Sequence, residues 1–176
     1  PKTQQTGRTV WYTSKDLKTW EFQGDFWAPD LYTMHEMPDL FYMDGWWYHI
    51  ITEYSHRSKM IYRMSRTMHG PWLAPKDEAF DGRAYYAGRT FAMDGKRYLL
   101  GWVPTKVEDS DKGAFQWAGT FVPHQLYQRE DGTLGCAMPD TVRAAFVEGE
   151  NLEDVTLATA ASRQEKVLRE DGGDFF

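Results

Sequence analysis

The sequence predicts an all-β protein, and three observations carry that prediction. Short runs rich in Tyr, Trp, Phe, Ile and Val recur along the chain, and no apolar period near 3.6 residues persists. Asp-Gly pairs, which favour tight turns, stand between strand-like runs at residues 44–45, 94–95 and 131–132. An eight-residue pattern around the first pair also returns around the second. These features are typical of hairpins in series rather than of helices.

Each Asp-Gly pair predicts a β-hairpin. Both residues of such a pair can take the positive φ that a type I′ turn requires, and the twist of that turn matches the twist of the flanking strands. We therefore expect three hairpins, with their turns at residues 44–45, 94–95 and 131–132.

An internal repeat indicates how the hairpins are arranged. Residues 41–48 and 91–98 share Phe, Met, Asp, Gly and Tyr at an offset of 50, and the segment from Ser14 to Trp20 resembles the one from Ser65 to Trp72. A period near 50 residues built from hairpins is typical of a β-propeller, whose four-stranded blades pack face to face. The chain is long enough for about three blades, which cannot close a ring. The missing blades are expected from upstream sequence or from another chain.

The residue composition of the chain changes after Phe146. Residues 1–146 are predicted to form the C-terminal part of the propeller. Residues 147–176 contain many Glu, Asp and Gly residues and only a weakly amphipathic stretch, so they are predicted to be a linker. An exposed acidic tail is the alternative.

Composition and charge exclude several functional classes. Lys and Arg total 20 against 26 Asp and Glu, a net charge of −6, so a nucleic-acid partner is not expected. No apolar run reaches the length that crosses a bilayer, so a membrane partner is not expected either. One cysteine, Cys136, rules out an internal disulfide framework. The histidines lack metal-ligand spacing and no nucleotide-binding motif occurs, so neither a metal nor a cofactor is expected.

One segment carries candidate chemistry. Residues 34–41 place two carboxylates, Glu36 and Asp39, just ahead of a hydrophobic strand, on a turn that Pro38 restricts. A carboxylic acid among Trp, Met and Phe side chains has its pKa raised by desolvation, so it can be protonated near neutral pH and donate to a leaving oxygen. Glu36 is therefore the candidate general acid, with a surface glutamate as the alternative. Asp39 is expected mainly to accept bonds from backbone donors in the turn.

Four segments together resemble glycoside hydrolase family 32, the β-fructosidases that include invertases, levanases and inulinases. Residues 35–41 resemble the family's Trp-Glu-Cys-Pro-Asp-Leu/Phe-Phe motif, whose Glu is the acid/base. Residues 85–91 resemble its Phe-Tyr-Ala-x-Gln-Thr-Phe motif, and residues 97–102 its Arg-x-Leu-x-Gly-Trp strand. Residues 117–126 resemble its Trp-x-Gly and Pro-Arg-Glu-Leu segment. The likeness covers about residues 8 to 142, in the family's order.

The resemblance implies a fold and a reaction. The fold would be a five-bladed propeller followed by a β-sandwich, so residues 147–176 would be the linker or the start of that sandwich. Glu36 would protonate the glycosidic oxygen and then, as a base, activate water in a retaining mechanism. The substrate would be a fructoside or a related furanoside, and export to the periplasm or the exterior would suit such an enzyme. The candidate substrate-binding residues are Trp102, Tyr86, Arg89, His35 and Asp39, with core packing as the alternative for Trp102 and a surface ion pair for Arg89.

Departures from the family pattern qualify this reading. The family's nucleophile motif, Trp-x-Asn-Asp-Pro-Asn-Gly, and its Arg-Asp-Pro motif do not occur, so both are expected upstream and the isolated chain is expected to be inactive. Ala84 stands where the family carries an Asp that binds fructosyl hydroxyls, which questions fructose as the sugar. Met37 replaces the Cys of the first motif, and Arg89 the Gln of the second. The alternatives are an arabinanase or xylosidase type of propeller hydrolase and a carbohydrate-binding propeller without catalysis.

Overall fold

The computed structural model describes residues 6–55, 57–110 and 112–146, and its elements are almost all strands, as predicted. The strands are β1 (Thr9–Thr13), β2 (Glu21–Trp27), β3 (Met34–Met43), β4 (Trp46–Tyr54), β5 (Lys59–Ser65), β6 (Tyr86–Met93), β7 (Lys96–Lys106), β8 (Phe115–Gln128) and β9 (Leu134–Ala137). A 3₁₀ turn, η1 (Val107–Asp109), and a short helix, α1 (Asp140–Arg143), complete the list. No helix among the described residues has the length and apolar character that a membrane crossing requires.

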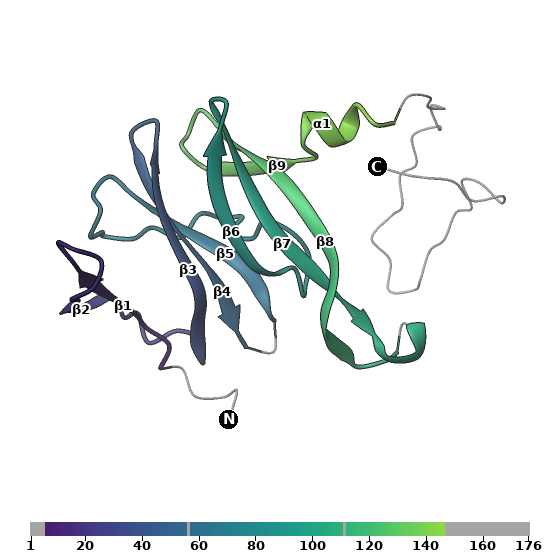
Figure 1. Ribbon diagram of the computed structural model, residues 1–176, viewed down its shortest axis with the longest axis horizontal. Coiled ribbons are helices and arrows are strands. Elements are labelled where there is room, and N and C mark those ends of the chain that lie inside the picture. The colour runs from purple at the N-terminus through teal and green to yellow at the C-terminus, as the bar shows by residue number, and fades with distance from the viewer. Residues whose placement is uncertain (1–5, 56, 111, 147–176) are drawn as a thin grey trace. The chain divides into compact units, whose positions relative to one another are not determined.

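The strands form three antiparallel sheets (Figure 1). The orders are β1-β2, β3-β4-β5 and β6-β7-β8-β9, so the last sheet has the four strands that a propeller blade would need. The middle sheet is extended beyond β5 by isolated bridges, Met64 with Leu73 and Ile61 with Ala79. Three sheets in series agree with the expectation of about three blades. The described residues close no ring, and a total of five blades stays a prediction.

The chain divides into two compact units, residues 1–140 and 141–176. The three sheets belong to the first unit. The predicted linker, residues 147–176, lies outside the described residues, so its assignment stays a prediction.

Two of the three predicted hairpin turns are confirmed and one is wrong in its type. Both residues of the first two Asp-Gly pairs have positive φ, 43° and 87° at residues 44–45 and 51° and 72° at residues 94–95, as type I′ requires. In the third hairpin only Gly132 has positive φ, 86°. Its turn is longer, because Arg129 N donates to Thr133 O and Gly132 N to Arg129 O. One left-handed glycine therefore suffices there, where the type I′ prediction required two left-handed residues.

The 50-residue repeat is a structural repeat as well. Phe41 pairs with Tyr48 across β3 and β4, and Phe91 pairs with Tyr98 across β6 and β7. Both ring pairs are stacked, with centroids 5.2 and 5.3 Å apart. The same residue types at the same offset therefore build the same hairpin in two successive sheets.

The core lies between the middle sheet and the four-stranded sheet. β4 and β5 are buried along nearly their whole length because both faces of the middle sheet are covered. The buried cluster draws on both sheets and on the segment that joins them, and consists of Phe41, Tyr48, Ile50, Met60, Tyr62, Met64, Phe80, Tyr85, Leu99, Leu126 and Leu134. The packing of these side chains holds β3 next to β6. The candidate site lies where these two strands meet.

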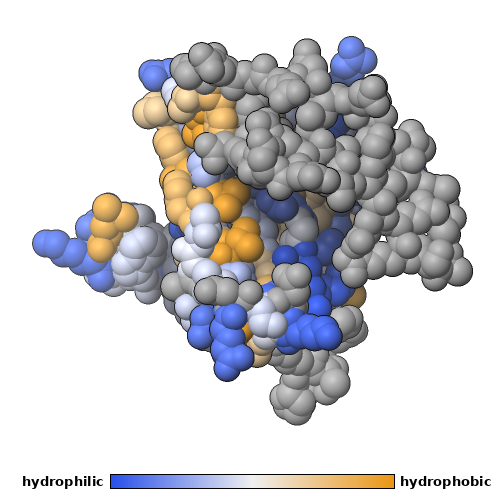
Figure 2. All heavy atoms as spheres, turned by 90° about the vertical axis from the view of Figure 1, so that its right-hand side faces the viewer, coloured by the Kyte–Doolittle hydropathy of each residue, from blue (hydrophilic) through white to orange (hydrophobic). Residues whose placement is uncertain are grey.

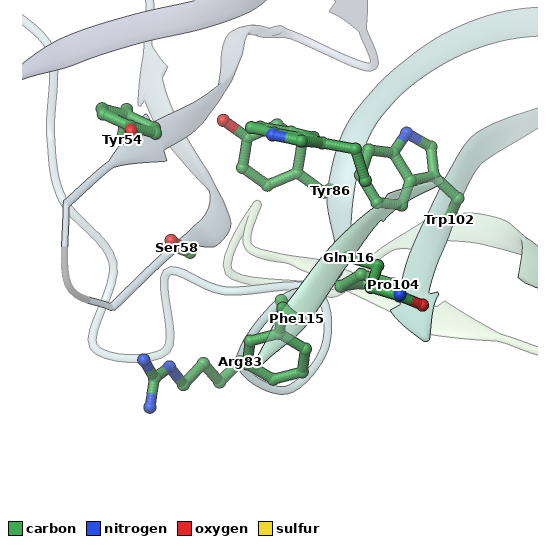
Figure 3. Close-up of a pocket in the computed structure, with 10 residues that line it drawn as sticks. Tyr54, Ser58, Arg83, Tyr86, Trp102, Pro104, Phe115 and Gln116 are labelled. Atoms are coloured by element: carbon green, nitrogen blue, oxygen red, sulfur yellow. The ribbon is translucent and has the colours of Figure 1, made fainter. Parts of the chain in front are cut away.

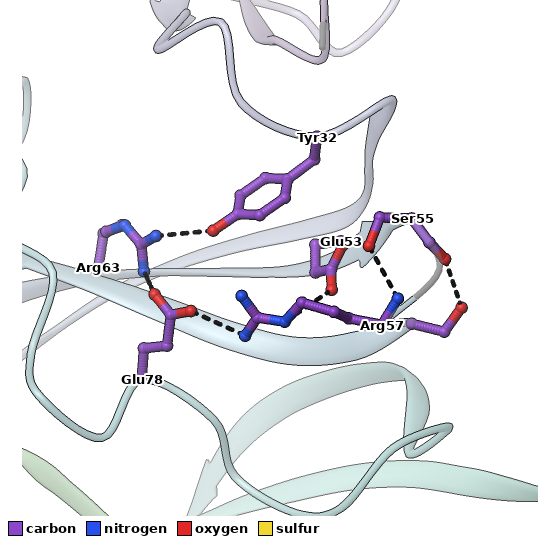
Figure 4. Close-up of polar contacts among 7 residues, drawn as sticks. Tyr32, Glu53, Ser55, Arg57, Arg63 and Glu78 are labelled. Atoms are coloured by element: carbon purple, nitrogen blue, oxygen red, sulfur yellow. Dashed lines mark hydrogen bonds and ion pairs between the residues drawn. The ribbon is translucent and has the colours of Figure 1, made fainter. Parts of the chain in front are cut away.

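A chain of charges ties the middle sheet to its flanking loops (Figure 4). Arg63 Nη1 lies 2.7 Å from Glu78 Oε2, and Arg63 Nη2 donates to the Tyr32 hydroxyl at 2.9 Å. Arg57 Nη2 donates to Glu78 Oε1 at 3.0 Å, and Arg57 Nε lies 3.7 Å from Oε1 of the fully buried Glu53. Because Arg63 and Glu53 are buried, these contacts are poorly screened by solvent, and they fix the loops that carry Tyr32 and Glu78.

The other side of the four-stranded sheet is apolar and exposed. Along β8, Phe121 and Tyr127 are 61% and 45% exposed. Figure 2 faces the side of the molecule on which β8 lies and shows hydrophobic residues gathered there in a column. In a propeller such a face packs against the next blade, so among the described residues the stack of sheets is open on this side.

One buried and one half-buried histidine, His49 and His35, join the β1-β2 sheet to the middle sheet. Thr9 Oγ1 lies 3.2 Å from His35 Nδ1 and 3.2 Å from His49 Nε2. Burial lowers the pKa of His35 to about 4 and that of His49 to about 3. Both rings are therefore neutral at pH 7, and the junction between the sheets depends on that neutrality.

Acidification is expected to destabilise the fold through these rings. Their folded-state pKa values lie below the unfolded value near 6.5, so the unfolded chain binds protons first. The stabilisation is complete above about pH 6.5 and decreases progressively as the pH falls toward about 4 and 3. Urea midpoints measured between about pH 7 and about pH 5 should fall in the parent and fall less in His49→Gln. An equal pH dependence in both proteins would show that His49 does not carry the effect.

Candidate functional site

The candidate acid, Glu36, is placed by an irregularity in β3. Opposite β4, Glu36 pairs with Thr52 whereas Asp39 pairs with Ile50, so Met37 and Pro38 together face one residue. This is a β-bulge, and Met37 at its centre has a φ of 51°. The bulge brings Glu36 to the same face of the sheet as Asp39, the face that meets β6.

Glu36 is in direct contact with Tyr86, the first residue of β6. The Tyr86 hydroxyl donates a hydrogen bond to Glu36 Oε2. Burial, and then the bond to Glu36, raise the pKa of Tyr86 well above its usual range. Tyr86 therefore keeps its proton at neutral pH and acts as a fixed donor to one oxygen of Glu36, which leaves Oε1 available for another partner.

Three aromatic rings meet beside this pair. Tyr86 pairs with Trp102 across β6 and β7, and their ring centroids lie 5.4 Å apart. Trp117, from β8, lies 5.4 Å from Tyr86 and 5.9 Å from Trp102. Residues from three adjacent strands therefore form one aromatic cluster next to the carboxylate.

A pocket of about 260 Å³ opens onto this cluster (Figure 3). Its aromatic lining comes from Tyr54, Tyr86, Trp102, Phe115 and Trp117. Its polar lining includes Ser58, Arg83 and Gln116. Aromatic faces with a few polar groups suit the apolar face and the hydroxyls of a sugar ring.

Asp39 and Arg89 contact protein groups on the neighbouring strand. Asp39 Oδ2 accepts hydrogen bonds from Thr90 N and Thr90 Oγ1, both at 2.7 Å. Arg89 Nη1 donates to the carbonyl oxygen of Pro38 at 2.7 Å. Asp39 thus accepts from a backbone donor, as expected, although this donor belongs to β6 rather than to its own turn. A role for either residue in binding substrate stays a prediction.

His35 lies apart from Glu36. Neighbouring residues of a strand point to opposite faces, and the His35 ring stacks on Trp27 with centroids 4.7 Å apart. Its Nε2 lies 3.3 Å from Leu31 O, and its Nδ1 contacts Thr9. These contacts place His35 at the junction with the β1-β2 sheet, and its predicted role in substrate binding stays a prediction.

Residue patterns did not single out three members of the pocket as site residues. Trp117 stands in a segment that resembles a family motif, but the resemblance assigns it no role, and Tyr54 and Phe115 lie at strand ends. An alternation of aromatic residues at positions 115 and 117 of β8 was the available signal for two of them. Among the described residues no group of three or more His, Cys, Asp or Glu side chains could hold a metal ion.

Comparisons with known proteins show the family of the chain and its fold. The chain matches the sequence model of the glycosyl hydrolases family 32 N-terminal domain over residues 1–134. It is 28% identical, over 157 residues, to a sucrose-6-phosphate hydrolase of Vibrio alginolyticus, a match that covers 76% of this chain. It is also 28% identical, over 149 residues and 74% of this chain, to a sucrose-6-phosphate hydrolase of Staphylococcus xylosus. The chain spans about a third of the length of these relatives, 32% and 30%.

Solved structures show the same likeness in the fold. A Bombyx mori GH32 beta-fructofuranosidase superposes with a TM-score of 0.63 at 22% identity, covering 86% of this chain and 36% of that chain. A thermostable family-43 glycoside hydrolase superposes with a TM-score of 0.53 at 19% identity, covering 74% of this chain and 47% of that chain. At these identities the likeness concerns the arrangement of sheets.

Proposed function

This chain belongs to glycosyl hydrolase family 32, as its four motifs predicted, and from that premise we propose that it is the part of a retaining fructoside hydrolase that carries the acid/base, Glu36. The observation that supports this most directly is the contact of Glu36 with Tyr86 at the edge of an aromatic pocket. The nucleophile and the residue that stabilises the transition state are proposed to lie in sequence upstream of residue 1.

The geometry suits both halves of a retaining reaction. Tyr86 holds Oε2, so Oε1 is the atom that carries the proton to the glycosidic oxygen in the first step. After the leaving sugar departs, the same oxygen accepts a proton from water, which attacks the covalent intermediate. One carboxylate with one free oxygen therefore serves as acid and then as base.

The proposed substrates are fructosides such as sucrose. The two curated relatives are named as sucrose-6-phosphate hydrolases, and one solved structure of the Bombyx mori enzyme is described as a complex with sucrose. The pocket next to the Glu36–Tyr86 contact is lined by Trp102 and Trp117, and we propose that these rings contact the second sugar of the substrate. Aromatic faces give such a ring a contact that depends little on its exact hydroxyl pattern.

Ala84 favours a second candidate. It lines the pocket, and its methyl side chain has no oxygen that could accept a bond from a sugar hydroxyl. The absence of an acidic side chain at this position fits a carbohydrate-binding propeller without catalysis, or a hydrolase for another furanoside. An activity screen that compares fructosides with aryl arabinofuranosides separates these candidates from a fructosidase.

The test is an activity screen of the full-length polypeptide encoded by the gene. We expect it to release fructose from sucrose, inulin or levan, and we expect the 176-residue chain alone to release none. Aryl arabinofuranosides are the comparison substrates. Cleavage of these alone would assign another sugar, and binding of fructosides without any cleavage would favour the binding module.

A further inference from the structure

The bulge that places Glu36 has a counterpart in the next sheet. In β6, Tyr86 pairs with Trp102 whereas Arg89 pairs with Leu100, so Ala87 and Gly88 together face one residue. Ala87 has a φ of 53°, close to the 51° of Met37. The two bulges are 50 residues apart, and the repeat therefore makes Glu36 equivalent to Tyr86 and Asp39 equivalent to Arg89.

The two bulges are bonded to each other across the sheets. Arg89 reaches from β6 to the carbonyl oxygen of Pro38, inside the β3 bulge. Asp39, which ends that bulge, accepts two bonds from Thr90. Thr90 Oγ1 in turn accepts a bond of 2.8 Å from Arg97 Nη1. We call the Arg89 to Pro38 bond and the two Thr90 to Asp39 bonds the bulge clasp.

We propose that the bulge clasp is a positioning device for the acid/base, with Arg89 and Asp39 as positioning residues that hold Glu36 against Tyr86. The inference rests on the proposed function of Glu36. It assigns the two residues a role through the β3 backbone instead of through the sugar.

The physical reason lies in the backbone of the bulge. The left-handed region is unfavourable for a residue other than glycine, so Met37 keeps its φ of 51° only while its surroundings hold it. If the bulge were lost, the pairing would slip by one residue and Glu36 would turn to the opposite face of the sheet. The bonds that hold the bulge on the β6 side are those of the clasp.

The first experiment removes the Arg89 bond while keeping a long side chain. In the full-length polypeptide, Arg89→Met is expected to lower kcat on sucrose by about tenfold to a hundredfold, with KM nearly unchanged, because the acid is misplaced. Arg89→Lys, which retains a donor, is expected to recover part of the loss. Turnover of aryl fructosides with good leaving groups should change little, because their departure needs no proton.

The matched control is Arg66→Met. Arg66 Nη1 also donates one bond to a carbonyl oxygen of the β3-β4 hairpin, that of Gly45 at 3.0 Å, but at the turn and not at the bulge. The Arg66→Met variant should therefore turn over sucrose at the rate of the parent. An increase in KM alone in Arg89→Met would make Arg89 a substrate-binding residue, and equal losses on sucrose and aryl fructosides would make it a structural one; either result overturns the proposal.

A second measurement is independent of activity. The side-chain carboxyl ¹³C signal of Glu36, identified by its absence in Glu36→Gln, is expected to shift in Arg89→Met and in Asp39→Ala but not in Arg66→Met. If the parent cleaves no fructoside, the proposed function fails, whereas this signal still reports whether the clasp holds Glu36. An unchanged signal in both clasp variants overturns the clasp whatever the activity.

Discussion

Glu36→Gln in the full-length polypeptide is expected to lower kcat on sucrose by about a thousandfold. The amide is nearly isosteric with the carboxylic acid and can still accept the bond from Tyr86. It cannot give up or take the proton that the glycosidic oxygen and the water require. The fold and the binding of sucrose should therefore be preserved while the chemical step is lost.

Changing the leaving group of the substrate and the attacking nucleophile shows which step Glu36→Gln has lost. An aryl fructoside with a good leaving group needs no proton for the first step, and azide needs no base for the second. With both supplied, turnover of Glu36→Gln should return to within about tenfold of the parent. Glu130→Gln, an exposed glutamate in the β8-β9 turn, is the control and should match the parent. Equal losses on sucrose and on the aryl fructoside with azide would remove Glu36 from the acid/base role.

The strands were predictable because local signals specify them. Asp-Gly pairs fixed two hairpin turns, and the repeat of Phe41 and Tyr48 as Phe91 and Tyr98 fixed the pairing around them. The third turn differs because a glycine in the left-handed region also closes a longer loop, and residue types alone do not distinguish the two.

The bulge was not predictable from the pattern, and it decides where Glu36 points. Counting pairs from the turn at residues 44–45 places Glu36 opposite Glu53 on the wrong face of the sheet. The extra residue in β3 changes that partner to Thr52. Pro38 indicates an irregularity in the strand, but its presence does not predict which neighbouring residue takes the positive φ.

The site was predictable only in part for a related reason. Glu36, Tyr86 and Trp102 stand in motifs, and the structure brings them together. Trp117 also stands in a motif-like segment, but its contact with Tyr86 and Trp102, and the place of Tyr54 in the pocket, follow from the pairing and packing of distant strands, which a local pattern does not indicate. The family resemblance implies that Asp39 and Arg89 bind substrate, whereas their observed contacts lie between β3 and β6.

Gly101→Ala is expected to destabilise the fold by about 2–3 kcal/mol. A Cβ at this position in β7 would lie 2.6 Å from Cζ of Tyr85 and 2.8 Å from its hydroxyl. Tyr85 is fully buried, and its hydroxyl donates to Val122 O at 3.0 Å, so the ring has nowhere to move. The alternative is a shift of β7, which would displace the adjacent Trp102 from the pocket. The urea midpoint and the near-ultraviolet circular dichroism should both change.

Gly82→Ala is the matched control, because nothing lies within 4 Å of a Cβ there and its stability should stay within about 0.5 kcal/mol of the parent. A double-mutant cycle with Tyr85→Leu identifies the cause. Leucine lacks the ring atoms that the new Cβ meets, so adding Gly101→Ala to Tyr85→Leu should cost much less than adding it to the parent. If the two substitutions instead add, the loss comes from the β7 backbone and not from the ring. Gly101 would then be needed for the backbone of β7 itself, and the position of Trp102 would depend on that backbone and not on the contact between Gly101 and Tyr85.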